Sequence, residues 1–246
     1  MIDVHCHILP GIDDGAANLA ESMALLRLAV ADGIKRMVAT PHINPGYFDN
    51  NRQTINQALA NLRAQISSEQ LDIEVAAAAE VRVTADLMLA VERQQLPFLG
   101  SWQGQQVLLL EFPPSHIPPG SDKLIKWLSQ KGIVAMIAHP ERNREVQSNL
   151  ALLDPFRRLG CLFQLTASSL LGDLGERHQT TAKQLVQNRV YHVMASDCHN
   201  VNRRPPRLTA SIEQVTALTD LDYAQSLVFH NPQIITTTLD FQNGQA

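Results

Sequence analysis

Short apolar segments recur along the chain at intervals of about 25 to 40 residues, and they are rich in the residue types that favour β-strands. Each segment is nearly continuously apolar, which is typical of strands buried on both faces of a parallel sheet. The pattern predicts strands at residues 1–5, 35–40, 72–80, 106–112, 132–139, 160–166 and 190–196.

Helical patterns separate these strands. The clearest covers residues 18–33, where Asn18 is a candidate N-cap, Glu21 follows three residues later, and Gly33 is a candidate stop. The pattern over residues 121–132 ends in the same way, at a glycine. Strands that alternate with helices indicate a parallel sheet with its helices outside.

Seven such units follow one another without a low-complexity linker, and 45% of the residues are hydrophobic. This is enough to bury a sizeable core. We therefore predict a single α/β domain over residues 1–246, with the parallel sheet closed into a barrel. Only a short polar segment, residues 241–246, is expected after the last unit.

Composition narrows the class of partner and the compartment. Charged residues make up 18% of the chain, the net charge is −4 and there is no basic block, so we expect no nucleic-acid partner. No apolar run approaches the roughly 18 residues of a membrane span, and no signal-peptide pattern is present. The three cysteines, Cys6, Cys161 and Cys198, lack metal-type spacing and fit a reducing compartment. We expect a cytoplasmic protein without membrane insertion.

Side chains capable of metal binding stand at the ends of nearly all the predicted strands. They are His5, His7, His42, Glu80, Glu111, His139, Asp197 and His199. In a parallel barrel the C-terminal strand ends open onto one face, so these side chains should converge. A single such histidine is more often a hydrogen-bonded structural residue than a ligand, but strand propensity does not require the joint pattern. Buried carboxylates need compensating positive charge, which favours a metal cluster.

The opening fragment His5-Cys6-His7 allows two phosphatase chemistries. Residues two apart on a strand point the same way, so both histidines can reach one ion while Cys6 points away. A cysteine-dependent phosphatase loop also begins His-Cys, but it needs an arginine six residues after the cysteine, where Ile12 stands. Cys198 also lies between two ligand-type residues and is interpreted in the same way. The pattern therefore favours metal chemistry over a thiolate nucleophile.

With these residues in place, the chain resembles the polymerase-and-histidinol-phosphatase (PHP) superfamily. Within it, the chain is most similar to the bacterial manganese-dependent protein tyrosine phosphatases of capsule and exopolysaccharide loci. The matching motifs span positions 3 to 206 in order: "DVHCHILPGIDDG", "ATPHINPGYF", "AAEVR", "LLEFP", "AHPERN" and "SDCHNVNRRPP". The resemblance implies a distorted (β/α)7 barrel of the PHP type.

The same resemblance implies up to three metal ions, Mn²⁺ in the first place, although this mixed nitrogen and oxygen set would also accept iron or zinc. One ion would be held by His5, His7, Glu80 and Asp197. A second would share Glu80 and add Glu111 and His139. A third would use Asp14, His42 and His199. The sequence pattern alone does not indicate Asp14 as a ligand, because "GIDDG" is typical of a turn. Its neighbour Asp13 is the alternative for the same role.

Phosphate-binding arginines are implied as well. Arg142 and Arg204, together with Asp197, are expected to serve catalysis. Arg203 stands next to Arg204, and Arg144 stands close to Arg142, so the arginine assignment stays open at this point.

Two aromatic residues are weaker candidates for contact with the substrate ring. Tyr47 and Phe48 lie in "NPGYFDN", in a loop on the expected active face. Loop aromatics more often pack on their own protein, which is the competing interpretation.

The implied activity is that of a metal-dependent protein tyrosine phosphatase, a phosphoric monoester hydrolase. Phosphotyrosine would be hydrolysed by direct attack of a metal-bound hydroxide, with charge on the phosphoryl oxygens stabilised by the metals and arginines. The implied partner is a tyrosine-phosphorylated protein, a bacterial tyrosine kinase of polysaccharide synthesis and export.

Two alternatives remain. The first keeps the metals and changes the substrate to a small phosphomonoester such as histidinol phosphate. Histidinol phosphatases of this superfamily tend to carry His where Glu111 stands, so the resemblance favours phosphotyrosine. The second is a barrel that has lost activity and serves as a binding module, but every expected ligand position is filled. The general acid, the oligomeric state and the physiological substrate stay open.

Overall fold

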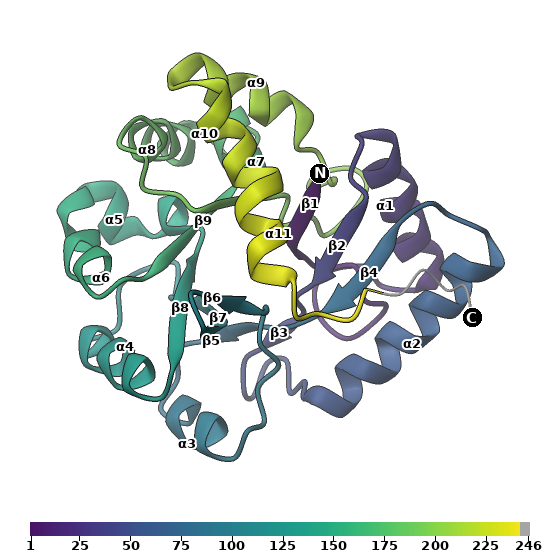
Figure 1. Ribbon diagram of the computed structural model, residues 1–246, viewed down its shortest axis with the longest axis horizontal. Helices are drawn as coiled ribbons and strands as arrows, with labels where there is room; N and C mark the ends of the chain where they lie inside the picture. The colour runs from purple at the N-terminus through teal and green to yellow at the C-terminus, as the bar shows by residue number, and fades with distance from the viewer. Residues whose placement is uncertain (242–246) are drawn as a thin grey trace.

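The computed structural model describes residues 1–241, in which strands and helices alternate along the chain (Figure 1). Residues 242–246, the end of the expected polar segment, lie outside the described residues. The strands are β1 (Ile2–Cys6), β2 (Arg36–Ala39), β3 (His42–Ile43), β4 (Glu74–Ala77), β5 (Glu80–Arg82), β6 (Ser101–Trp102), β7 (Gln105–Glu111), β8 (Ile133–Ala138), β9 (Leu162–Thr166) and β10 (Val193–Ala195).

The helices surround the strands. They are α1 (Leu19–Ala31), α2 (Arg52–Ser68), α3 (Leu87–Glu92), α4 (Ser121–Gln130), α5 (Arg144–Ser148), α6 (Asp154–Arg158), α7 (Ala167–Leu171), α8 (Glu176–Gln187), α9 (Thr209–Leu218), α10 (Leu221–Gln225) and α11 (Asn231–Thr236). Two short 3₁₀ helices are η1 (Pro140–Arg142) and η2 (Leu150–Leu153), and η3 (Ser226–His230) is a π-helix. Within the described residues, no helix has both the length and the apolar character needed to cross a bilayer.

The strands form two parallel sheets, with orders β1-β2-β4 and β10-β9-β8-β7-β5-β3, and β6 pairs antiparallel with β7. The first strand is also hydrogen-bonded to the segment after β10. The Asp197 N–H donates to the His5 carbonyl (2.8 Å), and the His7 N–H donates to the Cys198 carbonyl (2.9 Å). The parallel α/β class is thus confirmed, whereas the strands are paired as two sheets rather than as one uninterrupted barrel.

Two of the predicted strands are interrupted, which corrects the sequence prediction. The strand predicted at 35–40 ends at Ala39 and resumes as β3, and the strand predicted at 72–80 ends at Ala77 and resumes as β5. Pro41 lies in the first interruption and has no N–H to continue the ladder. The resumed pieces β3 and β5 pair with each other in the other sheet, and His42 and Glu80 are their first residues.

Alternate strand residues form a buried apolar cluster that packs separately from the larger helix-covered core. Val107 and Leu109 of β7 belong to it, as do Val193 and Ala195 of β10. The next residues of the same parity are Glu111 and Asp197, at the C-terminal strand ends. The period of two along a strand therefore carries the carboxylates to the inward side, one step beyond the apolar residues.

In β1 an irregular register determines which residues lie on the inward side. Ile2 and Val4 belong to the inner cluster, but Cys6, two residues further on, belongs to the outer core. The register shifts between Asp3 and Cys6, as at a β-bulge. The shift changes the face on which the later residues lie, and it places Cys6 away from the inner cluster.

The helix-end predictions hold. The Asn18 side chain caps α1 by accepting from the Glu21 N–H (3.0 Å), and Gly33 follows the helix with φ 88°. Helix α4 ends at Gln130, and Gly132 follows with φ 74°.

Helix α11 was not anticipated, because its sequence "NPQIIT" mixes a proline with β-branched residues of modest helix propensity. It lies across the end of the sheets from which the strands start (Figure 1), and Ile235 joins the inner cluster. Gly100 makes this close approach possible. A Cβ atom added at Gly100 would lie 1.9 Å from the Ile235 carbonyl oxygen, and the backbone φ of Gly100 is 124°.

We therefore expect Gly100→Ala to lower the free energy of unfolding by about 3 kcal/mol or more, because both the backbone conformation and the contact with α11 exclude a side chain. Gly104→Ala is the control. Its φ is 81° but nothing lies within 4 Å of an added Cβ, so about 1 kcal/mol is expected. Urea denaturation of both variants measures the difference, and equal losses would contradict this account of α11.

Candidate metal centre

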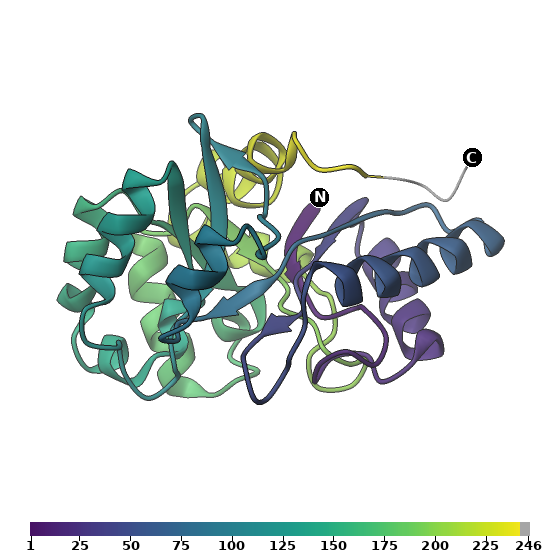
Figure 2. The same ribbon diagram turned by 90° about the horizontal axis from the view of Figure 1, so that it is seen from below.

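The predicted ligands meet at the C-terminal ends of the strands, opposite α11. Figure 2 shows α11 along the upper edge and the loops that follow β1, β3 and β10 along the lower edge. Four groups of side chains have ligand atoms within 4.8 Å of one another. They are His7, Asp14, His42 and His199; His5, His7 and Glu80; His5, His139 and Asp197; and His42, Glu80 and Glu111. Together these groups contain all nine predicted ligands.

Four ligand atoms face one another at the centre of the cluster. The Nε2 atoms of His5 and His7 are 3.3 Å apart. Glu80 Oε2 lies 3.3 and 3.4 Å from them, and Asp197 Oδ1 lies 3.4 Å from each. Ligand atoms held tetrahedrally about 2.0–2.2 Å from a shared ion lie about 3.3–3.6 Å apart. The two histidine nitrogens and either carboxylate oxygen therefore have the separation that one bound ion requires.

The partners behind the two histidines decide which ring nitrogens carry protons. Gln164 Oε1 lies 3.0 Å from His5 Nδ1, and Asp13 Oδ2 lies 2.7 Å from His7 Nδ1. An amide or carboxylate oxygen only accepts, so each Nδ1 donates, and Nε2 of a neutral ring presents a lone pair to the cluster. Two nitrogen lone pairs and two carboxylate oxygens then point at one another and repel, unless a cation lies between them.

The pKa shifts of His5 and Glu80 also indicate that positive charge is favoured at the centre of the cluster. Burial lowers the pKa of His5, but the carboxylates of Glu80 and Asp197 outweigh it and leave that pKa raised. Burial raises the pKa of Glu80, yet His5 and His42 bring it well below its usual range. Glu80 Oε2 is also buried without a hydrogen-bond partner. These residues fit a divalent cation, because it would satisfy the orphaned oxygen and the facing lone pairs together.

A second set of donors surrounds the other Glu80 oxygen. His139 Nε2 lies 2.8 Å from Glu80 Oε1 and 4.0 Å from Glu111 Oε1. Burial, helped by Arg142, lowers the pKa of His139 to about 4, so the ring is neutral and able to ligate near pH 7. Burial and the neighbouring Glu80 raise the pKa of Glu111 to about 7. Arg82 Nη2, 2.9 Å from Glu111 Oε2, partly offsets that effect.

The third set lies nearer the surface. Asp14 Oδ1 is 3.4 Å from His42 Nε2 and 3.5 Å from His199 Nε2. Asp13 instead lies behind His7 and accepts from the His42 N–H (3.2 Å). The structure thus brings Asp14, rather than Asp13, to the histidines of the predicted third position. His42 connects this set to the deeper ones, because its Nδ1 is 3.1 Å from Glu80 Oε2.

Two ligand residues have strained backbones. His139 and Asp197 have φ values of 31° and 51°, in the left-handed region that non-glycine residues rarely adopt. His139 directly follows the end of β8, and Asp197 lies two residues after the end of β10. Such conformations cost of order 1–3 kcal/mol and persist where the surroundings enforce them, commonly at functional sites.

Two of the four candidate arginines contact the ligand cluster, and two do not. Arg142 and Arg204 both donate to Asp197 Oδ2. Burial raises the pKa of Asp197, but Arg204, His5 and Arg142 lower it well below its usual range. Arg203 and Arg144 are exposed, and neither contacts the cluster through an ion pair in residues 1–241.

The two loop aromatics lie differently. The Phe48 ring stacks on His42, with 5.4 Å between ring centroids and 15° between planes. Tyr47 is 82% exposed beside it. Phe48 therefore already packs on a predicted ligand, whereas Tyr47 is free to meet another molecule.

Sequence reasoning missed two buried polar residues close to the ligands, Gln164 and Glu141. Gln164 accepts from both His5 Nδ1 and the His139 N–H (3.1 Å). Glu141 is fully buried and accepts from the Thr166 N–H (3.1 Å) and the Tyr191 hydroxyl (3.0 Å). The available signal was a glutamine within an otherwise apolar predicted strand, and the one acidic residue within "AHPER".

A parallel α/β fold that gathers nine ligand-type side chains around a buried glutamate defines a candidate metal-binding protein. The chain belongs to the capsular polysaccharide synthesis family CpsB/CapC, whose sequence profile matches residues 1–237.

Curated relatives cover most of the chain. The tyrosine-protein phosphatase YwqE of Bacillus subtilis is 37% identical over 204 residues, which are 83% of this chain and 79% of YwqE. The tyrosine-protein phosphatase CpsB of Streptococcus pneumoniae is 26% identical over 240 residues, 96% of this chain and 98% of CpsB.

Solved structures agree. One comes from work on YwqE of Bacillus subtilis and CpsB of Streptococcus pneumoniae, described as unique metal-dependent tyrosine phosphatases. It matches with a TM-score of 0.88 and 33% identity, covering 99% of this chain and 98% of that one. An organophosphorus hydrolase mutant matches with a TM-score of 0.57 at 14% identity, over 96% of this chain and 92% of that one, which is a likeness of fold alone.

The facing lone pairs predict that Mn²⁺ stabilises the metal-stripped protein. At about 100 times Kd, binding to the folded state alone gives about 2.7 kcal/mol, or a Tm increase of roughly 5–10 °C for a chain of this size. Glu80→Gln should lose most of this increase, because the shared carboxylate is removed. Glu213→Gln, at an exposed position on α9, is the matched control and should keep it. Differential scanning calorimetry gives the answer, and an equal increase in both variants would contradict the proposed centre.

Proposed function

We propose that this chain is a metal-dependent protein tyrosine phosphatase acting in bacterial polysaccharide synthesis. The observation that carries the proposal is the double use of Asp197. Its Oδ1 faces the histidines of the metal cluster, and its Oδ2 receives Arg142 and Arg204. A cation site and two phosphate-type donors therefore share one carboxylate. The family and the named relatives support the same activity.

The proposed ligands form three sets, of which the first two share Glu80. They are His5, His7, Glu80 and Asp197; Glu80, Glu111 and His139; and Asp14, His42 and His199. We propose Mn²⁺ as the principal ion, with iron or zinc as alternatives for this donor set. Divalent ions, when bound, would lower the pKa of coordinated water from about 15.7 toward about 7 and offset phosphate charge.

The two arginines would bind and orient the phosphoryl group. Their side chains are 27% and 20% exposed, so both can contact Asp197 and still present N–H groups to a substrate. Guanidinium forks match phosphate oxygens and stabilise charge that develops on them. Asp197 would fix both forks toward the metal centre.

Cys6, the thiol between two predicted ligands, is not placed to act as the nucleophile. Cys6 is fully buried, and its Sγ lies 3.3 Å from the Val38 carbonyl oxygen, on the side away from the ligands. Burial raises the pKa of its thiol well above the usual value. Direct hydrolysis is therefore favoured over a covalent intermediate. Tyrosinate suits this route, because a leaving group with a pKa near ~10 needs less protonation than an alkoxide.

The substrate we propose is a tyrosine-phosphorylated protein, a bacterial tyrosine kinase that controls polysaccharide synthesis, and we propose a cytoplasmic setting. Tyr47 is the aromatic residue free to contact the phosphotyrosine ring, while Phe48 supports His42. The net charge of −4 disfavours a nucleic-acid substrate.

The metal-stripped protein should hydrolyse a phosphotyrosine peptide only after Mn²⁺ is added. Cys6→Ser should keep this activity. Arg142→Ala should lose about 10²–10³-fold in kcat/KM, because a charge-stabilising donor is removed. Arg144→Ala, two residues away and exposed, is the matched control and should change little.

Histidinol phosphate serves as the competing substrate in the same assay. Metal-dependent activity on it alone would keep the metal centre and overturn the protein substrate. Activity without metal that disappears in Cys6→Ser would overturn the mechanism.

A further inference from the structure

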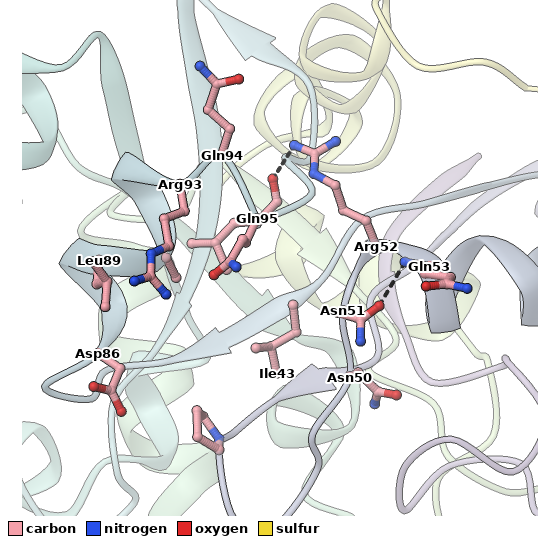
Figure 3. Close-up of a pocket in the computed structure, with 13 residues that line it drawn as sticks. Ile43, Asn50, Asn51, Arg52, Gln53, Asp86, Leu89, Arg93, Gln94 and Gln95 are labelled. Atoms are coloured by element: carbon pink, nitrogen blue, oxygen red, sulfur yellow. Dashed lines mark hydrogen bonds between the residues drawn. The ribbon is translucent and has the colours of Figure 1, made fainter.

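A cavity of about 680 Å³ lies between the N-terminus of α2 and helix α3 (Figure 3). Its volume lies in the range of sites that bind ligands rather than scattered solvent. It adjoins the strand that carries His42, because Ile43, the next residue of β3, lines it, and the two side chains point to opposite faces of that strand. The Asn50 side chain, also in its lining, donates to the His42 carbonyl (2.9 Å).

The two loops that border the cavity follow the C-terminal ends of β3 and β5. These are the strands that bring His42 and Glu80 to the metal centre. The cavity therefore opens at the same end of the fold as the centre. A chain whose phosphorylated residue lies at the metals has neighbouring residues that can enter the cavity.

The lining is basic and rich in amides. Arg52 and Arg93 stand against a single acidic lining residue, Asp86. Within residues 1–241, the Arg93 side chain makes no ion pair or hydrogen bond, although the chain as a whole is acidic, at −4. Gln94 and Gln95 follow it, and Figure 3 shows Arg93, Gln94 and Gln95 on the side opposite Asn51. Side-chain amides can form hydrogen bonds with a peptide backbone, and an arginine without an ion-pair partner can bind a carboxylate.

The cavity is also held open by its own contacts. The Arg52 guanidinium donates to the Leu96 carbonyl and so connects the start of α2 to the segment after α3. The Asn51 side chain caps α2 by accepting from the Gln53 N–H (2.9 Å). Apolar surface is available from Ile43 and from Leu89, which is 45% exposed. A preformed site of this kind orders less on binding.

We propose that this cavity binds the acidic peptide segment that flanks phosphotyrosine in the protein substrate. A substrate carboxylate pairs with Arg93, its backbone meets the glutamine amides, and an apolar neighbour packs on Leu89. This inference rests on the proposed tyrosine phosphatase activity. It adds that the enzyme reads the sequence around the phosphorylated residue and does not recognise phosphotyrosine alone.

The test compares phosphotyrosine peptides of equal length with acidic flanks or with Gln and Asn flanks, the acidic residues being placed before or after the phosphotyrosine. The wild-type protein should prefer an acidic peptide by about two- to fivefold in kcat/KM, the range of one exposed ion pair. Arg93→Ala should remove this preference through KM. Its activity on p-nitrophenyl phosphate, which has no flanks, should stay unchanged.

Arg158→Ala on α6 is the matched control, since Arg158 is exposed and lies outside the cavity lining, and it should keep the preference. Arg93→Glu should reverse the preference toward lysine-flanked peptides, which a purely structural role of Arg93 would not do.

Hydrolysis of all phosphopeptides at equal rates, or a preference that survives Arg93→Ala, would overturn the role of the cavity while leaving the phosphatase activity standing. Failure to hydrolyse any phosphotyrosine compound would overturn the proposed function and, with it, this inference.

Discussion

The structure depends on one buried carboxylate surrounded by imidazoles. Glu80 is 1% exposed, and its two oxygens lie 2.8–3.4 Å from nitrogens of His5, His7, His42 and His139. A carboxylate removed from water costs several kcal/mol unless positive charge compensates it. In this centre a proton shared among the rings or a bound cation must supply that charge. The spacing of the donors fits a cation, and the rest of the fold holds the donors at this spacing.

Irregularities in the strands place the donor atoms around Glu80. A register shift in β1 brings His5 and His7 to the ligand side, and breaks before β3 and β5 make His42 and Glu80 the first residues of the resumed strands. The left-handed backbone of Asp197 adds local strain at the cluster. A regular barrel would keep more hydrogen bonds between its strands. In this fold some of those hydrogen bonds are lost where the strands break, and the breaks position the ligand residues.

The sequence predicted what periodicity and residue type control. Apolar runs located the parallel strands, Asn18 and Gly33 marked the first helix, and side-chain parity placed Cys6 away from the ligands. The interruption near Ala77 could not be foreseen, because "DIEVAAAAE" reads as one uniform strand. Nor could the support of His5 by Gln164, since it joins residues 159 positions apart in the chain. Such contacts depend on tertiary packing, which no local pattern records.

Diffraction from Mn²⁺-loaded crystals at the manganese absorption edge tests the central claim most directly. We predict anomalous peaks within about 2.0–2.3 Å of the His5, His7, Glu80 and Asp197 donor atoms, with further peaks beside Glu111 and Asp14. Such peaks would place the ions where the lone pairs converge. Peaks elsewhere, or a fully loaded crystal without density between His5 and His7, would contradict the account.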